Sequence, residues 1–315
     1  MASLKGPTAQ GKGAGGHGHP AARPFLKWAG GKRQLLPALC RFYPSQFAKY
    51  WEPFLGSAAV FFDLHARGLL DGHASVLADI NPDLIACYAA VRDQPDMVID
   101  ALDNLAREHA RLGSAHYYDV RDRQFNPQRA SHGRAAYTPA LAAMFIYLNR
   151  TGYNGLFRLN ADGAFNVPAG RYANPRICDA ENLRRVSAAL QAPGVRLLVQ
   201  PFDCVILEAK AGDFVYFDPP YSPLSKTARF TSYTAEGFSH DDQRMLRDLL
   251  LALAKRGCHA VLSNSTAPEI VELYERDKAI AAAGFHCHTV PARRAINSKA
   301  GGRGSVNEYI ITNVA

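Results

Sequence analysis

The sequence has few of the features that mark a secreted or membrane-bound protein. No apolar run approaches the length of about 20 residues that a helix needs to cross a bilayer. Nothing in the chain resembles the apolar core of a signal peptide. The cysteines lie far apart and form no C-x-x-C pair, which gives no sign of a disulfide framework or a redox motif. They are Cys40, Cys87, Cys178, Cys204, Cys258 and Cys287. We therefore expect a cytoplasmic protein with no membrane partner.

Two short motifs lack the residues that their chemistry would require. His286-Cys287-His288 contains metal-ligand types, but consecutive strand residues point to opposite faces and no fourth ligand is nearby, so we predict no metal site. The segment "WAGGKR" has Leu26 where a phosphate-binding P-loop needs glycine, and Arg33 where it needs serine or threonine. An ATPase of the P-loop type is thereby excluded.

What the chain does have is enough apolar material for a full core and an excess of positive charge. Its 315 residues are 48% hydrophobic, and the formal net charge is +8. This length suits one large or two moderate domains. A basic balance favours a polyanionic partner, although it also serves simple solubility. Residues 1–22 are rich in glycine and predict a flexible N-terminal arm.

The remaining chain alternates strand and helix signals. A strand, a tight turn and a helix are predicted between residues 50 and 68, a strand at 75–78 is followed by a helix after Pro82, and a helix is predicted at 34–42. The same pattern returns after residue 195, which predicts an α/β fold with an open sheet. Residues 96–194 are polar and mostly helical, and interrupt the pattern like an insertion.

The segment "DFVYFDPPY" carries the clearest chemical signal. Phe214–Phe217 predicts a buried strand that must stop at Asp218, because Pro219 and Pro220 cannot donate ladder hydrogen bonds. One interpretation is an edge strand with Asp218 as a cap and Tyr221 as packing. The other is alkylation of a planar exocyclic amine, with the Asp218 carboxylate and the Pro219 carbonyl as acceptors and the aromatic ring stacked on the base.

A second pair of residues suggests a nucleotide-like ligand. Gly56 lies in the first strand-to-helix turn, and Asp79 follows it by 23 positions. This is close to the offset of about 20 residues at which an acid meets a ribose hydroxyl in nucleotide-binding units. The alternative is that Gly56 is ordinary turn chemistry and Asp79 caps the helix that begins at Pro82.

Taken together, these segments resemble the Dam-type, D12-class (alpha-group) DNA adenine-N6 methyltransferases. The resemblance covers nearly everything from Pro24 onward. It rests on "FLKWAGGK" (25–32), "EPFLGSAAVF" (52–61), "LADINPDLI" (77–85), "YLNRTGYNGLFRLNADGAFNVPAGRY" (147–172), "DPPY" (218–221) and "FTSY" (230–233), in the family's order.

The resemblance implies a Rossmann-like catalytic domain, residues 23–95 and 195–315, that binds S-adenosylmethionine, with an inserted helical target-recognition domain, residues 96–194. The cofactor would be bound by Trp28, Lys32, Phe54, Gly56, Ser57, Asp79 and Asp218. The catalytic residues would be Asp218, Pro219, Pro220 and Tyr221. The first turn has Ala58 where the family often has glycine, so we expect a slight shift of this turn.

The same resemblance implies double-stranded DNA as substrate. Arg158 would read guanine, with Asn154 and Leu156 beside it, whereas a phosphate contact is the alternative for Arg158. The loop that carries Arg294, Lys299 and Arg303 would follow the DNA backbone, unless it is only a solvated hairpin tip. The target adenine would be flipped out of the duplex. The expected site contains G-A-T, with GATC as the leading sequence.

Two other functions remain open from the residues alone. One is a non-catalytic DNA-binding protein on the same scaffold, and the other is a methyltransferase that acts on an RNA base or a protein amide. We expect a monomer that associates with the nucleoid. The sequence leaves open whether a restriction enzyme accompanies it.

Overall fold

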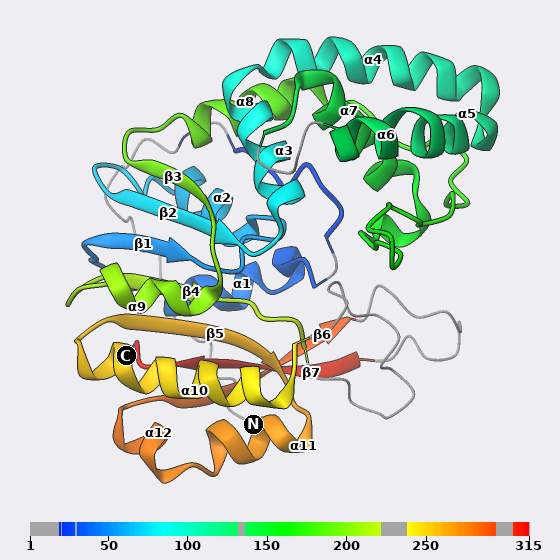
Figure 1. Cartoon of the computed structure of the whole chain (residues 1–315). Coiled ribbons are helices and arrows are strands. Elements are labelled where there is room, and N and C mark those ends of the chain that lie inside the picture. Colours follow the sequence, from blue (N-terminus) through cyan, green and yellow to red (C-terminus); the bar gives the residue numbers. More distant parts are fainter. Residues whose placement is uncertain are drawn as a thin grey trace, which may run out of the picture.

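The computed structural model describes residues 19, 21–28, 30–131, 136–221, 238–293 and 305–314. They form a mixed α/β fold around a seven-stranded sheet of order β3-β2-β1-β4-β5-β7-β6 (Figure 1). The strands are β1 (Lys49–Glu52), β2 (Ala74–Asp79), β3 (Val195–Val199), β4 (Phe214–Phe217), β5 (His259–Ser265), β6 (His286–Arg293) and β7 (Ser305–Thr312).

The chain reverses its order in the middle of the sheet. β1 pairs in parallel with both β2 and β4, so successive strands spread outward from β1 on one side and from β4 on the other. β2–β3 and β4–β5 are also parallel, whereas β7 runs antiparallel to β5 and β6. In open sheets of this kind, ligands bind beyond the carboxyl ends of the strands at such a switch point.

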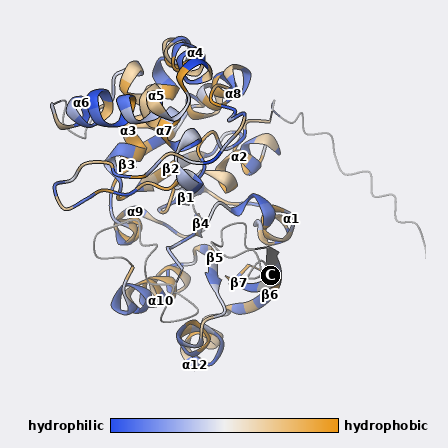
Figure 2. Cartoon of the chain, turned by 90° about the vertical axis from the view of Figure 1, so that its right-hand side faces the viewer, coloured by the Kyte–Doolittle hydropathy of each residue, from blue (hydrophilic) through white to orange (hydrophobic). Residues whose placement is uncertain are grey.

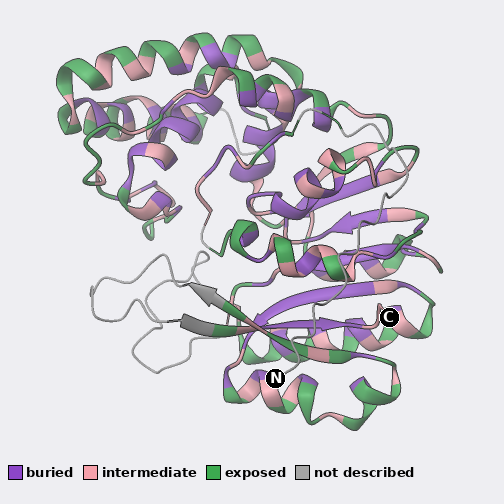
Figure 3. Ribbon diagram, turned by 180° about the vertical axis from the view of Figure 1, so that it is seen from behind, coloured by how far each residue is buried: buried purple, intermediate pink, exposed green. Residues whose placement is uncertain are grey.

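β4 shows why its sequence is continuously apolar. Phe214 and Tyr216 belong to the core on one face of the sheet, whereas Val215 and Phe217 belong to the core on the other. All four are buried because helices cover both faces. In Figure 3 the central strands are coloured as buried and the outer faces of the helices as exposed.

Helices lie on both sides of this sheet. In order along the chain, they are α1 (Leu36–Leu39), α2 (Ala59–Ala66), α3 (Pro82–Asp93), α4 (Pro95–Leu112), α5 (Ser114–Asp119), α6 (Asn126–Ser131), α7 (Pro139–Thr151), α8 (Ala180–Leu190), α9 (Val205–Glu208), α10 (His240–Lys255), α11 (Pro268–Ile270) and α12 (Lys278–Ala282). Surface helices such as α4 and α8 carry both hydrophilic and hydrophobic residues, as expected for helices with one face on a core (Figure 2).

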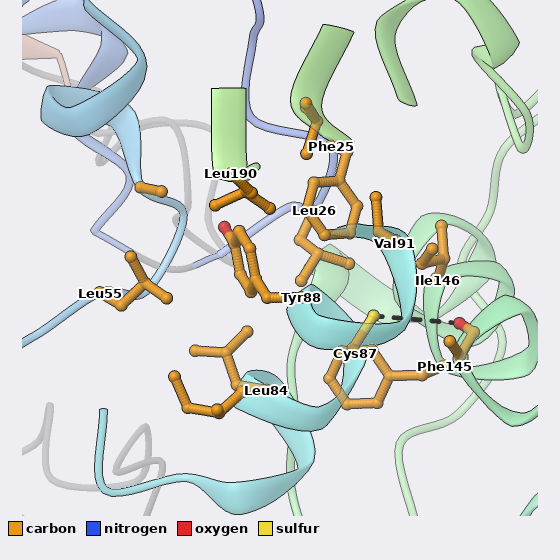
Figure 4. Close-up of a cluster of buried hydrophobic side chains, with 14 of the residues drawn as sticks. Phe25, Leu26, Leu55, Leu84, Cys87, Tyr88, Val91, Phe145, Ile146 and Leu190 are labelled. Carbon is orange, nitrogen blue, oxygen red and sulfur yellow. Dashed lines mark hydrogen bonds between the residues drawn. The ribbon is translucent and has the colours of Figure 1, made fainter. Parts of the chain in front are cut away.

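α3 connects the sheet to the helices between β2 and β3. It contacts β2 and β3 as well as α4, α7 and α8. Figure 4 shows Cys87 and Tyr88 of α3 among Phe25 of the N-terminal segment, Phe145 of α7 and Leu190 of α8. These side chains belong to a single buried cluster, so residues 96–194 are joined to the sheet through a shared hydrophobic core.

Most of the predicted elements are confirmed, but the edge-strand alternative and the predicted helix at 34–42 are wrong. The strand at 214–217 ends immediately before Asp218, but it lies in the centre of the sheet, so the edge-strand interpretation fails. The predicted helix at 34–42 is instead a series of short turns, α1 flanked by 3₁₀ turns at Lys32–Gln34 and Cys40–Phe42.

The turn after β1 keeps a left-handed backbone at Ala58, with φ 55° and ψ 32°. The methyl group therefore does not force this residue out of the left-handed region. It is also completely buried. A left-handed residue other than glycine costs about 1–2 kcal/mol.

We expect Ala58→Gly to leave the free energy of unfolding nearly unchanged. Relief of the left-handed strain offsets the loss of a buried methyl group, about 0.8 kcal/mol, and the greater backbone entropy of glycine, about 0.5–1 kcal/mol. Ala58→Val should destabilise by more than about 2 kcal/mol, because a β-branched residue is least tolerated at this φ. Denaturant titrations of both variants provide the measurement, and a large loss of stability in Ala58→Gly would contradict the expected backbone strain.

Candidate active site

The turn after β1 requires glycine at position 56. Gly56 has φ 45°, and a Cβ there would lie 3.0 Å from Cδ1 of Trp28. The hydroxyl of Tyr88 in α3 donates a hydrogen bond of 3.1 Å to the Gly56 carbonyl and thereby holds the turn in place. A Cβ on Gly31 would lie 3.5 Å from Oγ of Ser57, so the segment around Trp28 runs close to this turn.

Asp79 lies at the end of β2 and holds two loops together. Its Oδ2 accepts a hydrogen bond from the Gly56 N–H at 3.1 Å, and its Oδ1 accepts one from the Asn81 N–H at 2.9 Å. Burial raises the pKa of Asp79 to about 6, and these backbone N–H groups oppose the shift. The helix cap is Asn81, whose side chain accepts from Asp83 and Leu84, so the interpretation of Asp79 as the cap of α3 is wrong.

Asp218 lies at the end of β4 and forms an ion pair with Lys32. The Lys32 Nζ is 2.6 Å from Asp218 Oδ1 and 4.3 Å from the centre of the Tyr221 ring. It also donates to the Gly30 carbonyl at 2.6 Å. The Lys32 side chain is 5% exposed, so this cation is enclosed between a carboxylate and an aromatic ring. The predicted cofactor residue and the predicted catalytic residues thus lie in contact.

Further contacts hold the Asp218–Tyr221 segment in place. The Tyr221 hydroxyl donates to Glu308 Oε2 on β7 at 2.8 Å. The Pro220 carbonyl accepts a hydrogen bond from Gln243 Nε2 at 3.5 Å, and Gln243 in turn accepts one from Asn264 Nδ2 at 3.1 Å. Gln243 and Asn264 are completely buried. The proline turn is therefore supported from both α10 and β5.

The electrostatic surroundings shift the titration of Asp218. Burial and, to a smaller extent, the negative charge of Glu308 raise the pKa of this carboxyl while the Lys32 ammonium lowers it, and the net result is a pKa of about 6. Glu52 at the end of β1 is also buried. Burial raises the pKa of Glu52 to about 8, while hydrogen bonds from the Tyr50 hydroxyl and the Phe61 N–H oppose that shift.

The structure adds residues that sequence reasoning missed at the same edge of the sheet. Asp203 lies in a 3₁₀ turn after β3, and among the described residues its buried Oδ1 has no hydrogen-bond partner. Ile80 follows Asp79 and is 60% exposed. Phe54, a predicted cofactor residue, stacks on Phe202 with ring centres 5.1 Å apart. An acid shortly after a strand is the signal that identified Asp79 and Asp218, and it would also have found Asp203.

The predicted DNA-reading residues lie in a hairpin, residues 152–170, that follows α7. Bridges join Gly152 to Ala169 and Leu159 to Phe165. Phe157 of the hairpin stacks against Trp28 with ring centres 6.2 Å apart and planes inclined by 24°. The hairpin thus packs on the segment that carries the predicted cofactor residue.

Within this 152–170 hairpin the three predicted residues differ in exposure. Arg158 is exposed, and its Nε donates to Asn166 Oδ1 at 2.8 Å. Asn154 is half-exposed with φ 54°, next to the exposed Tyr153. Leu156 is half-buried and packs partly on the core. Arg294, Lys299, Arg303 and the segment "FTSY" (230–233) lie outside the described residues.

The described ranges contain neither a metal-binding cluster nor a membrane-spanning helix. No group of three or more His, Cys, Asp or Glu residues in these ranges could hold a metal ion. His286, Cys287 and His288 lie in β6. None of the described helices is both long and apolar enough to cross a bilayer.

Comparisons with known proteins agree with this geometry. Residues 28–296 match the sequence profile of the D12 class N6 adenine-specific DNA methyltransferases. The chain is 40% identical to the type II methyltransferase M1.LlaDCHI of Lactococcus lactis subsp. cremoris, over 92% of this chain and 95% of the relative. It is also 40% identical to the type II methyltransferase M.MjaIII of Methanocaldococcus jannaschii, over 92% and 99%.

The chain is also similar to a relative that is named a DNA adenine methylase and not a type II methyltransferase. The DNA adenine methylase of Escherichia coli K12 is 35% identical over 91% of this chain and 94% of its own length. The seven-stranded sheet is consistent with a class I methyltransferase fold. Membership also implies a methyl donor, normally S-adenosylmethionine. The chain therefore belongs to the D12 class of N6 adenine-specific DNA methyltransferases and is a DNA adenine-N6 methyltransferase.

Proposed function

We propose that the protein transfers a methyl group from S-adenosylmethionine to the N6 amine of an adenine flipped out of duplex DNA, within a GAT-containing site for which GATC is the leading sequence. The observation that carries this proposal is the Asp218 carboxylate at the carboxyl end of β4, paired with Lys32 beside the Tyr221 ring. It offers an ionised acceptor, a cation and an aromatic ring within one enclosed volume.

The chemistry required of this site is modest. The lone pair of an exocyclic amine is delocalised into the purine ring, so the nitrogen must become tetrahedral before it can attack. Asp218 and the Pro219 carbonyl would accept hydrogen bonds from the amine and favour that change, while Tyr221 would stack on the base. The proton would leave the amine through Asp218 or solvent. The donor's sulfonium is already an activated leaving group.

Several features fit S-adenosylmethionine at the carboxyl edge of β1, β2 and β3. Asp79 is half-buried, and among the described residues its oxygens accept from the backbone N–H groups of Gly56 and Asn81, which leaves further acceptor capacity for the ribose. The unpaired Oδ1 of Asp203 suits the amine of the cofactor's adenine, and the exposed side chain of Ile80 suits its ring face. Trp28 and the Phe54–Ser57 turn would enclose the methionine part, whose carboxylate would pair with Lys32.

We further propose that residues 96–194 form the target-recognition domain on a catalytic domain of residues 23–95 and 195–315, preceded by an N-terminal arm, residues 1–22. Arg158 is exposed in the 152–170 hairpin and its guanidinium is oriented by Asn166, which supports a role in reading guanine. Asn154 and Leu156 would lie beside it, and Arg294, Lys299 and Arg303 would follow the DNA backbone. We propose a monomer that acts on the nucleoid in the cytoplasm.

The recognised site can be tested with unmethylated plasmid. After incubation with labelled S-adenosylmethionine, the plasmid is digested with paired restriction enzymes that differ in sensitivity to adenine methylation at GATC. Protection supports the proposed site. Incorporation of label without protection would move the site to another sequence but keep the reaction.

The pH dependence of the reaction should report the ionisation of Asp218. Its pKa is raised to about 6, and the ionised form is the acceptor, so kcat/KM should fall about tenfold for each pH unit below that value. Glu308→Gln removes a negative charge that raises this pKa, and should move the acidic limb to lower pH. The pKa of Asp79 is also about 6, but it is set by burial and backbone hydrogen bonds and not by Glu308. Glu308→Gln therefore distinguishes Asp218 from Asp79. The control is Glu272→Gln, which should leave the pH profile unchanged. If the acidic limb of the kcat/KM profile did not move in Glu308→Gln, its assignment to Asp218 would be contradicted.

Replacing Asp203 should affect cofactor binding rather than transfer. Asp203→Asn keeps the shape of the side chain but replaces one acceptor with a donor, which would oppose the amine of the cofactor's adenine. We expect the KM for S-adenosylmethionine to rise about tenfold, equivalent to about 1.4 kcal/mol, with kcat within a factor of about two. Steady-state kinetics at saturating DNA give both values. A fall in kcat with unchanged KM would place Asp203 outside the cofactor pocket.

A further inference from the structure

The buried side-chain amide of Asn149 joins the 152–170 hairpin to the segment that enters the proposed cofactor pocket. Asn149 in α7 accepts a hydrogen bond from the Lys27 N–H at 2.7 Å and donates to the Lys27 carbonyl, also at 2.7 Å. The same Nδ2 donates to the Gly155 carbonyl in the hairpin at 2.9 Å. The Asn149 side chain is 4% exposed, so water cannot replace these hydrogen bonds.

The contact between the hairpin and this segment is close. A Cβ on Gly155 would lie 2.4 Å from Cβ of Lys27, which is nearer than any side chain tolerates. Lys27 is followed by Trp28, whose indole packs over Gly56, and Gly56 is hydrogen-bonded to Asp79. A continuous chain of contacts therefore leads from the hairpin backbone, through Asn149, to Asp79, which we propose binds the ribose of the cofactor.

A second connection reaches the hairpin from the other side. Arg129 in α6 forms a buried bidentate ion pair with Asp83 at the start of α3, with both N–O distances 2.7 Å. Its Nη1 also donates to the Gly163 carbonyl in the hairpin at 2.5 Å. Asp83 follows the Asp79–Asn81 loop and also accepts from the Tyr137 hydroxyl at 2.6 Å. The hairpin is thus attached to both loops of the proposed cofactor pocket.

We infer that Asn149 is a positioning residue that couples cofactor binding to recognition of the DNA site. It touches neither ligand; it transmits the position of the Lys27–Trp28 backbone to Gly155, next to Asn154 and Leu156. A ligand that orders one segment therefore lowers the cost of ordering the other. The inference rests on the proposed role of the hairpin in reading DNA.

The chain provides a matched control in Asn182 of α8. Its amide bridges the backbone of Arg23 in the same manner, accepting from the N–H at 2.9 Å and donating to the carbonyl at 2.9 Å. Asn182 is 3% exposed. Within the described part of the chain, its side chain hydrogen-bonds to Arg23 and not to the hairpin. A loss of stability common to both sites can therefore be separated from a loss of coupling.

The experiment compares the wild-type protein with Asn149→Leu and Asn182→Leu. The affinity for S-adenosylhomocysteine is measured with and without the duplex that the protection assay identifies as substrate, and the affinity for that duplex with and without S-adenosylhomocysteine. In the wild type and Asn182→Leu, we expect each ligand to tighten the other by the same factor, about five-fold or more. In Asn149→Leu, the factor should fall to near one. Discrimination against a duplex with one changed base pair should fall about tenfold with it.

The inference is overturned if Asn149→Leu shows the same coupling factor as Asn182→Leu. It is also overturned if neither ligand changes the affinity of the wild-type protein for the other. Should Asn149→Leu fail to fold, Asn149→Asp retains the acceptor for the Lys27 N–H but cannot donate to the carbonyls of Lys27 and Gly155, and the same loss of coupling is expected. Arg158→Ala distinguishes a failure of the proposed DNA-reading role of the hairpin from a failure of coupling through Asn149. If this variant keeps full discrimination, the proposed role of the hairpin fails; if it loses discrimination while Asn149→Leu keeps coupling, only the present inference fails.

Discussion

Asp218→Asn should reduce kcat for adenine methylation by about 10²–10³, the cost of removing one well-placed electrostatic contact from an active site. The substitution keeps the shape of the side chain but removes the negative charge that Lys32 contacts at 2.6 Å. The amine would lose its ionised acceptor. The rate is best measured as single-turnover transfer from labelled S-adenosylmethionine to duplex DNA, at saturating concentrations of both.

The matched comparison is Asp203→Asn, another acid-to-amide change at the same edge of the sheet. That variant should raise the KM for the cofactor and keep kcat, whereas Asp218→Asn should lower kcat with a smaller effect on cofactor affinity. Circular dichroism should show an intact fold in both variants. Turnover of Asp218→Asn close to that of the wild type would exclude the proposed role of the carboxylate.

Arg158→Ala should reduce discrimination at one base pair of the site by about 1–3 kcal/mol, or about 5–150-fold. The side chain is exposed, and Asn166 holds its Nε at 2.8 Å, so the guanidinium is oriented without being buried. Transfer rates on the substrate duplex and on duplexes with single base changes give the discrimination at each position. At one base-pair position of the site, the variant should methylate duplexes with other bases nearly as fast as the substrate duplex.

Arg123→Ala is the control for Arg158→Ala. Its side chain is 83% exposed on the segment Val120–Phe125, so it tests the loss of a surface cation elsewhere in the inserted residues. A phosphate contact at Arg158 would instead weaken binding uniformly across sequences and reduce the slope of its salt dependence by about one. That pattern would support the alternative interpretation of Arg158.

The parts of the fold that local sequence determines were predictable. Phe214–Phe217 reads as a strand because all four side chains are apolar, and its end follows from the two prolines. The tight turn at Gly56 could be predicted because glycine marks such turns. The positions of Asp79 and Asp218 could be predicted because each acid comes at the end of a recognisable strand. These signals involve neighbours in sequence, so they can be recognised without tertiary information.

The contacts that complete the site could not be predicted in this way. Glu308 meets Tyr221 across 87 positions, and Asn149 meets Lys27 across 122. Neither spacing follows from helix or strand periodicity, because both depend on how distant elements pack. The central place of β4 also depends on strand order, which an apolar run does not specify, so its edge-strand alternative could be dismissed only from the sheet.

The most direct measurement is the identity of the methylated nucleoside. Duplex DNA containing GATC is incubated with the protein and methyl-labelled S-adenosylmethionine, digested to nucleosides and separated, beside a duplex in which the site is changed. We expect label in N6-methyldeoxyadenosine from the GATC duplex, incorporated about 10²–10³ times more slowly when Asp218→Asn replaces the wild type. Label in a methylated cytosine would contradict the proposed arrangement of Asp218, Lys32 and Tyr221 around an adenine amine, whereas no label in the GATC duplex despite measurable cofactor binding would contradict GATC as the site.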